Sequence, residues 1–473
     1  MGRWFWQYIS RLRFGTSPDP YTSLITLALM VSGLLLLFDL WNIKNKYIIV
    51  LSGLLFISHP AICFELSYRY MSPTFGVAFF LSILAVWCFE RIKSPCIAVM
   101  AGSVCVALSM GSYQAYICCA SVAFLTALLM KLSQNTKWKD IAGFCGRSGI
   151  GIVLGGIEYI VILNIYLQKA GIGMSVYQGG DRYSILYSIQ NLPSSLQKVY
   201  QIFDLYFRGI MYKINRMQEK HIFTVMFVLA LMLVALNMIR IFRKSKTKAV
   251  VFGLLILLYP AAVLSVLFIA TDAPLGLQTA CGPALFLAAL TCMFCNEKRI
   301  EDARQSDQGG RGIGKGGKIP GRIFALFMAG VLYGSIWQVI IDQNIMYEGR
   351  IATENIADLV VDKLLQEDLL SNDKQYVFVG IPVASPLYAI DPNYEYANQY
   401  ALYGAWYWGA HGSRSWRSVL EYRKGLRLNM ITGEEYETLS FSEIVTNMPQ
   451  FPAPGSIVEE NDIVYIKIGD ASY

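Results

Sequence analysis

The segment His59–Tyr70 holds the densest group of ionisable and aromatic side chains beside a long apolar run. Glu65 and Arg69 are four residues apart, so on a continuous helix they lie on one face. A guanidinium binds phosphate through paired hydrogen bonds, and a carboxylate can take a proton from a hydroxyl group. Tyr68 could stack on a sugar ring. The same spacing is equally compatible with an interfacial ion pair in an aromatic belt.

Polar residues in other segments are weaker candidates because each stands alone. Tyr113 and Gln114 lie in a tight turn, where a tyrosine is more often a belt residue than a ligand. Arg182 follows closely on two glycines, which is typical of a turn. The full set of catalytic or substrate-binding candidates is Arg3, Asp19, Glu65, Tyr68, Arg69, Tyr113, Gln114, Arg182 and Asp272.

The cysteines and the net charge exclude two classes of function. The ten cysteines include no CxxC pair, and most lie in apolar runs, where cysteine acts as a small apolar side chain. The sequence therefore predicts no metal site and no cofactor, and leaves a requirement for a divalent cation open. The net charge of +7 does not indicate nucleic-acid binding, because Lys and Arg occupy short loops rather than one basic face.

Long apolar runs must position the candidate residues. Apolar residues make up 55% of the chain and charged residues 15%, whereas soluble proteins carry about 25% charged residues. About ten runs approach the roughly 20 apolar residues that a helix needs to cross a membrane. We therefore predict an all-α polytopic transmembrane domain over residues 21–341. The runs are Tyr21–Phe38, Tyr47–Cys63, Pro73–Phe89, Pro95–Met110, Tyr113–Met130, Ser148–Leu167, Ile222–Phe242, Ala249–Ala270, Cys281–Cys295 and Ile323–Ile341.

The basic residues predict how these helices are oriented. Loops after the first, third, fifth, seventh and ninth runs carry nearly all of the inter-helix Lys and Arg, and the opposite short loops contain only Arg69. Basic loops remain in the cytoplasm. We therefore expect residues 1–20, the loop 168–221 and the segment 342–473 to face outward, and the glycine-rich linker 296–321 to be cytoplasmic.

Two outward segments have recognisable patterns. Within the long loop, Leu196–Met211 alternates apolar and charged residues at helical spacing, which predicts a helix at the membrane interface that could border a lipid-linked substrate. The segment 342–473 is predicted to be a small extracytoplasmic α/β domain. In it, Ile351–Leu364 has the pattern of a soluble helix, and Gln375–Ile381 and Ile463–Ile468 have that of strands.

Four short segments resemble one known family. They are Gly2–Trp4 (GRW), Phe64–Pro73 (FELSYRYMSP), Ser112–Tyr116 (SYQAY) and Met448–Ile468 (MPQFPAPGSIVEENDIVYIKI). With the number of helices, they resemble the bacterial serotype-converting O-antigen glucosyltransferases of type II, within the glycosyltransferase C superfamily. The resemblance covers nearly the whole chain.

The resemblance implies an inner-membrane enzyme. It would transfer a sugar, typically glucose, from a polyprenyl-phosphate carrier to O-antigen or another surface glycan on the outer face of the membrane. Such an enzyme needs a base for the acceptor hydroxyl and cationic groups for the departing phosphate. The resemblance thus assigns Arg69 and Arg3 to the phosphate, Glu65 or Asp19 to the acceptor, and Tyr68, Tyr113 and Gln114 to the pocket.

The chain also departs from the family. Relatives place an N-terminal helix and an acidic outer loop before the GR motif, and that loop supplies the presumed catalytic Asp. An outward Met1 without a preceding helix leads us to expect that the N-terminal segment 1–20 is truncated. Three alternatives stay open: a transporter or flippase of lipid-linked sugars, a glycan polymerase or ligase, and an inactive truncated homologue.

Overall fold

The computed structural model consists largely of helices, which form two compact units. Met1–Met211 with Met217–Ile336 form the first unit, and Tyr212–Arg216 with Trp337–Tyr473 form the second. The structure describes residues 2–13, 20–68, 70–171, 173, 190–205, 207, 219–269, 277–295, 319–389, 392–393, 401–402 and 412–470.

Most of the predicted apolar runs form long helices. Among the described residues, 7 helices are long and apolar enough to cross a membrane, and a bent pair of shorter helices raises this number to 8. The seven lie in α2 (Tyr21–Leu40), α5 (Ser72–Arg91), α6 (Pro95–Ser112), α7 (Ile117–Ser133, preceded by the short η2, Gln114–Tyr116), α8 (Trp138–Ala170), α11 (Glu219–Lys244) and α16 (Ile319–Gln366).

The bent pair consists of α3 (Lys46–Ile57) and α4 (Pro60–Ser67), which meet at an angle of 54°. Pro60 causes the break, because proline disfavours the helical conformation of the residue before it. His59 accordingly has an extended backbone, with φ of −67° and ψ of 135°. Its Nδ1 atom accepts a hydrogen bond of 3.2 Å from the Ala61 amide and so caps α4. The predicted run Tyr47–Cys63 is therefore helical but not straight.

Two further predicted runs are helical but too short to meet the same criterion. The run Ala249–Ala270 forms α12 (Lys246–Leu257), α13 (Tyr259–Val263) and the 3-10 turn η5 (Ser265–Phe268), and the run Cys281–Cys295 forms α14. The predicted number of about ten spans stays a prediction for these two segments.

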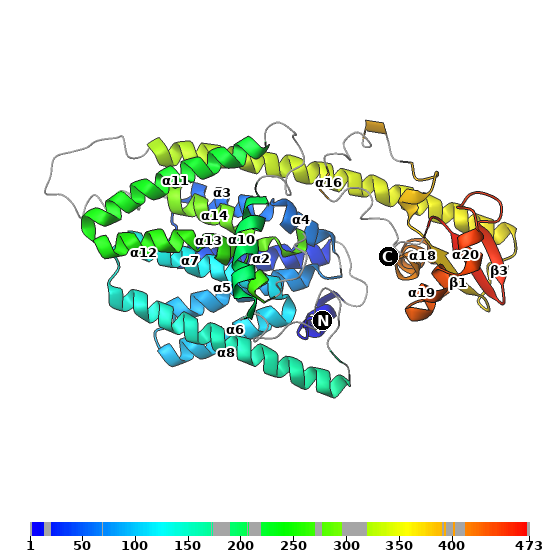
Figure 1. Ribbon diagram of the computed structural model, residues 1–473, viewed down its shortest axis with the longest axis horizontal. Helices are drawn as coiled ribbons and strands as arrows, with labels where there is room; N and C mark the ends of the chain where they lie inside the picture. Colours follow the sequence, from blue (N-terminus) through cyan, green and yellow to red (C-terminus); the bar gives the residue numbers. More distant parts are fainter. Residues whose placement is uncertain are drawn as a thin grey trace. The chain divides into compact units, whose positions relative to one another are not determined.

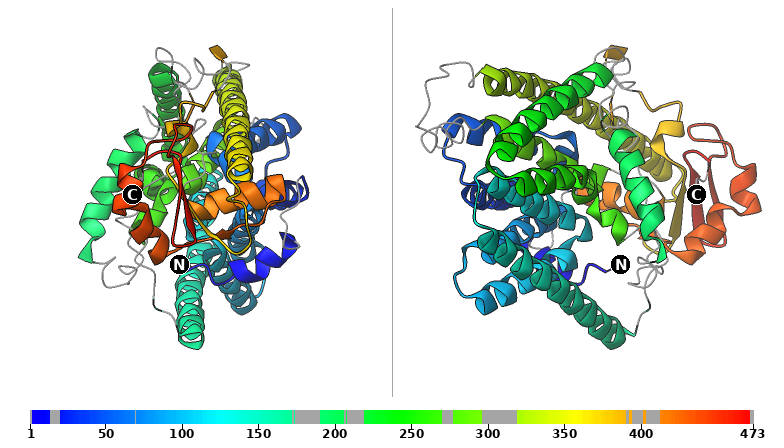
Figure 2. Two further views of the ribbon diagram at one scale, coloured as in Figure 1. Left: turned by 90° about the vertical axis from the view of Figure 1, so that its right-hand side faces the viewer. Right: turned by 60° about the vertical axis from the view of Figure 1, so that its left-hand side comes forward.

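Small residues bring α2, α5, α6 and α8 close together, side by side in this order (Figure 1). The ring of Phe89 on α5 fits against Gly102 on α6 and Gly151 on α8, where a Cβ atom would approach it to 2.0 and 2.2 Å. Glycine at these two positions leaves room for the ring, and small residues are common where helices pack together in membranes. Figure 2 shows the same row from two further sides, with α8 at its edge.

The contact between α6 and α8 can be tested with two neighbouring glycines. A Cβ atom on Gly155 would lie 2.6 Å from Val106 Cβ and 2.7 Å from the Ser103 carbonyl oxygen, whereas one on Gly156 would meet nothing within 4 Å. We expect Gly155→Ala to destabilise the protein by about 1–3 kcal/mol through overpacking. Gly156→Ala is the matched control. Thermal unfolding in detergent measures both, and equal midpoints would contradict the packing.

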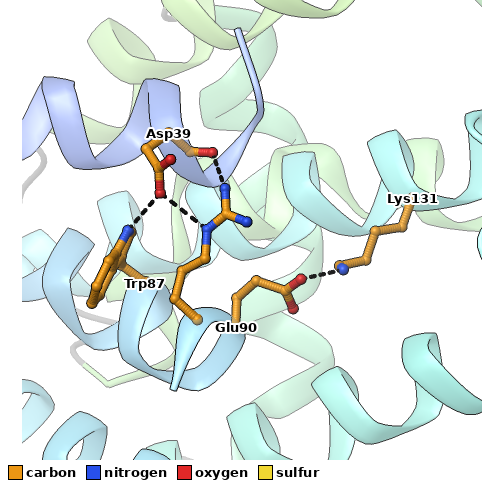
Figure 3. Close-up of polar contacts among 5 residues, drawn as sticks. Asp39, Trp87, Glu90 and Lys131 are labelled. Atoms are coloured by element: carbon orange, nitrogen blue, oxygen red, sulfur yellow. Dashed lines mark hydrogen bonds and ion pairs between the residues drawn. The ribbon is translucent and has the colours of Figure 1, made fainter. Parts of the chain in front are cut away.

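Charged residues connect the helices of the first unit at one end (Figure 3). Asp39 Oδ2 accepts hydrogen bonds from Trp87 Nε1 at 2.8 Å and from Arg91 Nε at 3.0 Å, and Lys131 pairs with Glu90. These contacts join the ends of α2, α5 and α7 for which the loop charges predict a cytoplasmic location. At 1.5 Å per residue, the other end of α5 lies about 30 Å away.

The second unit contains a four-stranded sheet with the order β2-β1-β4-β3, whose strands are β1 (Gln375–Val379), β2 (Asn429–Met430), β3 (Ile457–Glu460) and β4 (Ile463–Lys467). The predicted strands are confirmed, since β1 and β4 pair in parallel, with Gln375 opposite Ile463. Two strands had no sequence signal: β2 has two residues, and β3 ends in two glutamates.

Helices cover both faces of this sheet. On one face, α16 and α18 (Ser413–Lys424) contribute Ile356, Val360 and Trp416 to a core with Phe378, and on the other face α19 (Glu434–Ser440) and α20 (Glu443–Asn447) pack against Val377. The alternation of Val377 and Phe378 follows from the two-residue period of a strand. The soluble helix predicted at Ile351–Leu364 is the last part of α16, because no proline interrupts the preceding residues.

Candidate functional site

The N-terminal segment places Arg3 beside the end of α6, opposite the end that carries the ion pairs. The Phe5 amide donates a hydrogen bond of 2.9 Å to the Gly111 carbonyl, and the short helix α1 (Trp6–Ile9) follows. Trp4 is buried against Gly111, where a Cβ atom would approach its ring to 2.6 Å. Gly111 thus leaves room for the tryptophan that anchors this segment.

The Arg3 guanidinium lies over an aromatic ring. Its guanidinium carbon is 4.3 Å from the centre of the Tyr113 ring, and Nη1 is 3.8 Å from the Met71 sulfur. Within the described parts of the chain, no carboxylate forms an ion pair with Arg3. A partly buried guanidinium held by a ring and a thioether keeps its charge available for an anion.

Two side chains, Tyr159 and Gln114, hold the backbone next to Arg3. The Tyr159 hydroxyl donates a hydrogen bond of 2.9 Å to the Gly2 carbonyl oxygen and accepts one of 2.9 Å from Gln114 Nε2. Gln114 was predicted to bind substrate, whereas Tyr159, in the middle of α8, was not predicted at all.

Glu65 is fully buried in α4. Its Oε2 atom accepts a hydrogen bond from the Tyr116 hydroxyl, and Oε1 has no hydrogen-bond partner among the described residues. A buried carboxylate with an unused oxygen is costly in a low-dielectric environment. Such a group is a candidate for proton transfer or for binding a hydroxyl group.

Aromatic rings connect Arg3 with Glu65. The ring centres of Tyr113 and Tyr116 are 6.2 Å apart, and Phe75 packs edge-on against Tyr113 at 5.1 Å. The cation at one end and the carboxylate at the other therefore belong to one continuous cluster. Arg3, Glu65, Tyr113 and Gln114, all predicted as site residues, meet in it.

Tyr68 is held by a residue that the sequence did not single out. Gln278, in the 3-10 turn η6 (Leu277–Thr279) just before α14, donates a hydrogen bond from Nε2 to the Tyr68 hydroxyl. Tyr68 also packs edge-on with Phe64 at 5.1 Å, and Tyr70 beside it is 47% exposed. These rings and the amide are suited to the apolar face and hydroxyl groups of a sugar.

Four of the predicted site residues lie outside the described residues: Asp19, Arg69, Arg182 and Asp272. Across the described parts of the chain, no three His, Cys, Asp or Glu side chains gather where they could hold a metal ion. The described cluster itself offers a cation, a carboxylate, phenols and amides. Its partly buried cation, Arg3, can attract an anion, and its buried carboxylate, Glu65, keeps one oxygen without a hydrogen-bond partner among the described residues.

Comparison with known proteins adds one family. The profile of the family described as Glucosyl transferase GtrII matches residues 1–292. No curated protein and no solved structure matches the chain. The matched range is well over half of the chain, and it contains every described residue of the cluster, from Arg3 to Gln278.

Proposed function

Since the chain belongs to the Glucosyl transferase GtrII family, we propose that it transfers glucose from a polyprenyl-phosphate carrier to O-antigen or another surface glycan. The reaction would take place on the outer face of the bacterial inner membrane. The family supports glucosyl transfer, and the apolar helices support a location in a membrane. The carrier, the acceptor and the face of the membrane are parts of the proposal.

The observation that carries the proposal is the Arg3 guanidinium, stacked on Tyr113 and without a carboxylate partner among the described residues. It lies at the end of the helical row away from the Asp39, Arg91 and Lys131 contacts. Loop charges assign that basic end to the cytoplasm. A phosphate attached to a membrane lipid would meet Arg3 at the outer surface.

The proposed chemistry uses both ends of the cluster. An acceptor hydroxyl oxygen attacks the anomeric carbon of glucose, the bond from that carbon to the phosphate oxygen breaks, and the polyprenyl phosphate leaves with the electron pair. Glu65 takes the hydroxyl proton through Oε1, while Tyr116 holds Oε2. Arg3 stabilises the negative charge that grows on the departing phosphate. The proton passes finally to the released phosphate or to water.

An aromatic cluster supports a lipid-linked donor. The helix predicted at the interface, Leu196–Met211, overlaps α10 (Leu192–Leu205). In α10, Phe203 packs against Phe286 of α14 with ring centres 5.6 Å apart. The Tyr200 hydroxyl donates a hydrogen bond of 2.5 Å to the Leu257 carbonyl oxygen at the end of α12. An amphipathic helix fixed in this way could border an isoprenoid chain.

The transfer reaction can be tested with purified protein in vesicles. We expect labelled glucose to pass from polyprenyl-phosphate glucose to a lipid-linked glycan, one residue per acceptor. Movement of the donor across the vesicle membrane without a covalent product would contradict the proposal and favour a flippase. A product with many added residues would favour a polymerase.

The proposed orientation is tested by cysteine labelling in intact cells. Tyr422 on α18 is 70% exposed, so we expect Tyr422→Cys to react with a membrane-impermeant maleimide. Lys44→Cys, in a loop assigned to the cytoplasm, should react only after the cells are opened. The native Cys96, at the start of α6, is also exposed, and the loop before it is assigned to the same side as Lys44, so the unchanged chain should show little labelling. The reverse pattern would contradict the orientation.

A further inference from the structure

Tyr159 links an edge helix to the residue beside Arg3. Its hydroxyl lies between the Gly2 carbonyl oxygen and Gln114 Nε2, with both hydrogen bonds at 2.9 Å. Tyr159 is buried, although α8 as a whole is mostly exposed. Because phenol–carbonyl and amide–phenol hydrogen bonds are directional, this arrangement fixes the Gly2 peptide group.

The fit around Gly2 is tight. A Cβ atom at Gly2 would lie 2.2 Å from the Tyr159 oxygen and 2.6 Å from Gln114 Nε2. A side chain at this position would therefore push the backbone away from Tyr159. The glycine is needed here for close approach, which explains why glycine precedes the arginine.

The hydrogen bonds around Gly2 also set the direction of the Arg3 side chain. Arg3 follows Gly2 directly, and Gln114, which donates a hydrogen bond to Tyr159, follows Tyr113, the ring that the Arg3 guanidinium covers. The hydrogen bonds through Tyr159 therefore fix the backbone of Arg3 relative to the ring on which its guanidinium stacks. A loss of the Tyr159 hydroxyl would allow Gly2 and Gln114 to move independently.

We propose that Tyr159 is a positioning residue, whose hydroxyl group holds Arg3 against Tyr113 so that the guanidinium meets the donor phosphate. The inference rests on the proposed function. Tyr159 itself does not contact the phosphate. Its effect on phosphate binding passes through Arg3.

A double-mutant cycle on the full chain tests this inference. The variants are Tyr159→Phe, Arg3→Lys and the two combined, and the measurement is the Kd for farnesyl phosphate in detergent, together with the KM and kcat for glucosyl transfer. We expect Tyr159→Phe alone to raise the Kd and the donor KM about tenfold, because the buried Gly2 carbonyl and the partly buried Gln114 amide lose the hydroxyl that they share. In the Arg3→Lys background the same change should have almost no effect on the Kd, since the effects of substitutions at residues that act as a unit do not add.

A merely structural role would give a different result. Tyr159→Phe would then weaken binding by the same factor in both backgrounds, and that result would overturn the inference. Tyr166→Phe, a change of the same kind further along α8, is the matched control and should leave the Kd unchanged. If Tyr159→Phe folds poorly, Gln114→Met removes the other hydrogen bond of the phenol and should show the same dependence on Arg3.

Farnesyl phosphate binding and glucosyl transfer are measured separately, so the positioning role of Tyr159 and the proposed function can be tested independently. Farnesyl phosphate binding that depends on Tyr159 only when Arg3 is present supports the positioning role, even if no glucose is transferred. Glucosyl transfer by the unchanged chain with an unaffected Tyr159→Phe variant supports the function and overturns the positioning role. An unchanged chain that does not bind farnesyl phosphate overturns the role as well.

Discussion

Replacing Glu65 by glutamine is expected to reduce glucosyl transfer about 1000-fold, within the range attributed to a general base. The variant should still fold, because the glutamine carbonyl can accept the hydrogen bond that Tyr116 donates to Oε2. The change removes only the ability to take up a proton at Oε1, which has no partner among the described residues. The measurement is kcat with saturating donor and acceptor.

The matched control for this prediction is Glu158→Gln. Glu158 lies in α8 and accepts a hydrogen bond of 2.9 Å from Ser103 Oγ, so it is also a carboxylate with a hydroxyl partner, although it is only partly buried. Its replacement should leave kcat nearly unchanged. If Glu65→Gln retains full activity and the stability of the unchanged protein, Glu65 serves only to hold Tyr116 in the aromatic cluster.

Much of the helical framework could be predicted because apolar runs of membrane length are an unambiguous pattern. The bend at Pro60 was more difficult, since the run Tyr47–Cys63 stays apolar through the break. Its signal was His59-Pro60 itself, which marks an extended residue followed by a new helix. The very short strand β2 had no signal, because two residues show no period and depend on pairing with β1.

The candidate site could be predicted only where polar residues stand next to the ends of apolar runs. Arg3 and Tyr113 met that condition, but their stacking depends on how α6 and the N-terminal segment pack. Tyr159 was missed because tyrosine within an apolar run is common in membrane helices. Gln278 was missed because Asp272, a charged residue six positions earlier, was chosen as the candidate instead. The contact of Gln278 with Tyr68 depends on the fold, which brings the two segments together.

Replacing Arg3 by alanine is expected to reduce kcat/KM for transfer about 100-fold, as for the loss of one group that stabilises a developing oxyanion. Arg3→Lys should retain some activity, with a loss of about tenfold, because an ammonium keeps the charge but lacks the planar guanidinium that lies over Tyr113 and can bind phosphate through two parallel hydrogen bonds. Both values come from initial rates at varied concentrations of the donor lipid.

Arg11→Ala is the control that separates the effect of the Arg3 guanidinium from the effect of the net positive charge of the N-terminal segment. Arg11 belongs to the same N-terminal segment and is exposed, with its guanidinium 5.9 Å from the Tyr8 ring. Removing it changes the net charge as much as Arg3→Ala does, yet it should change transfer less than twofold by the usual size of exposed electrostatic effects. Equal losses for the two variants would mean that the segment attracts the donor by its overall charge. A loss confined to Arg3 would mean that the stacked guanidinium contacts the phosphate itself.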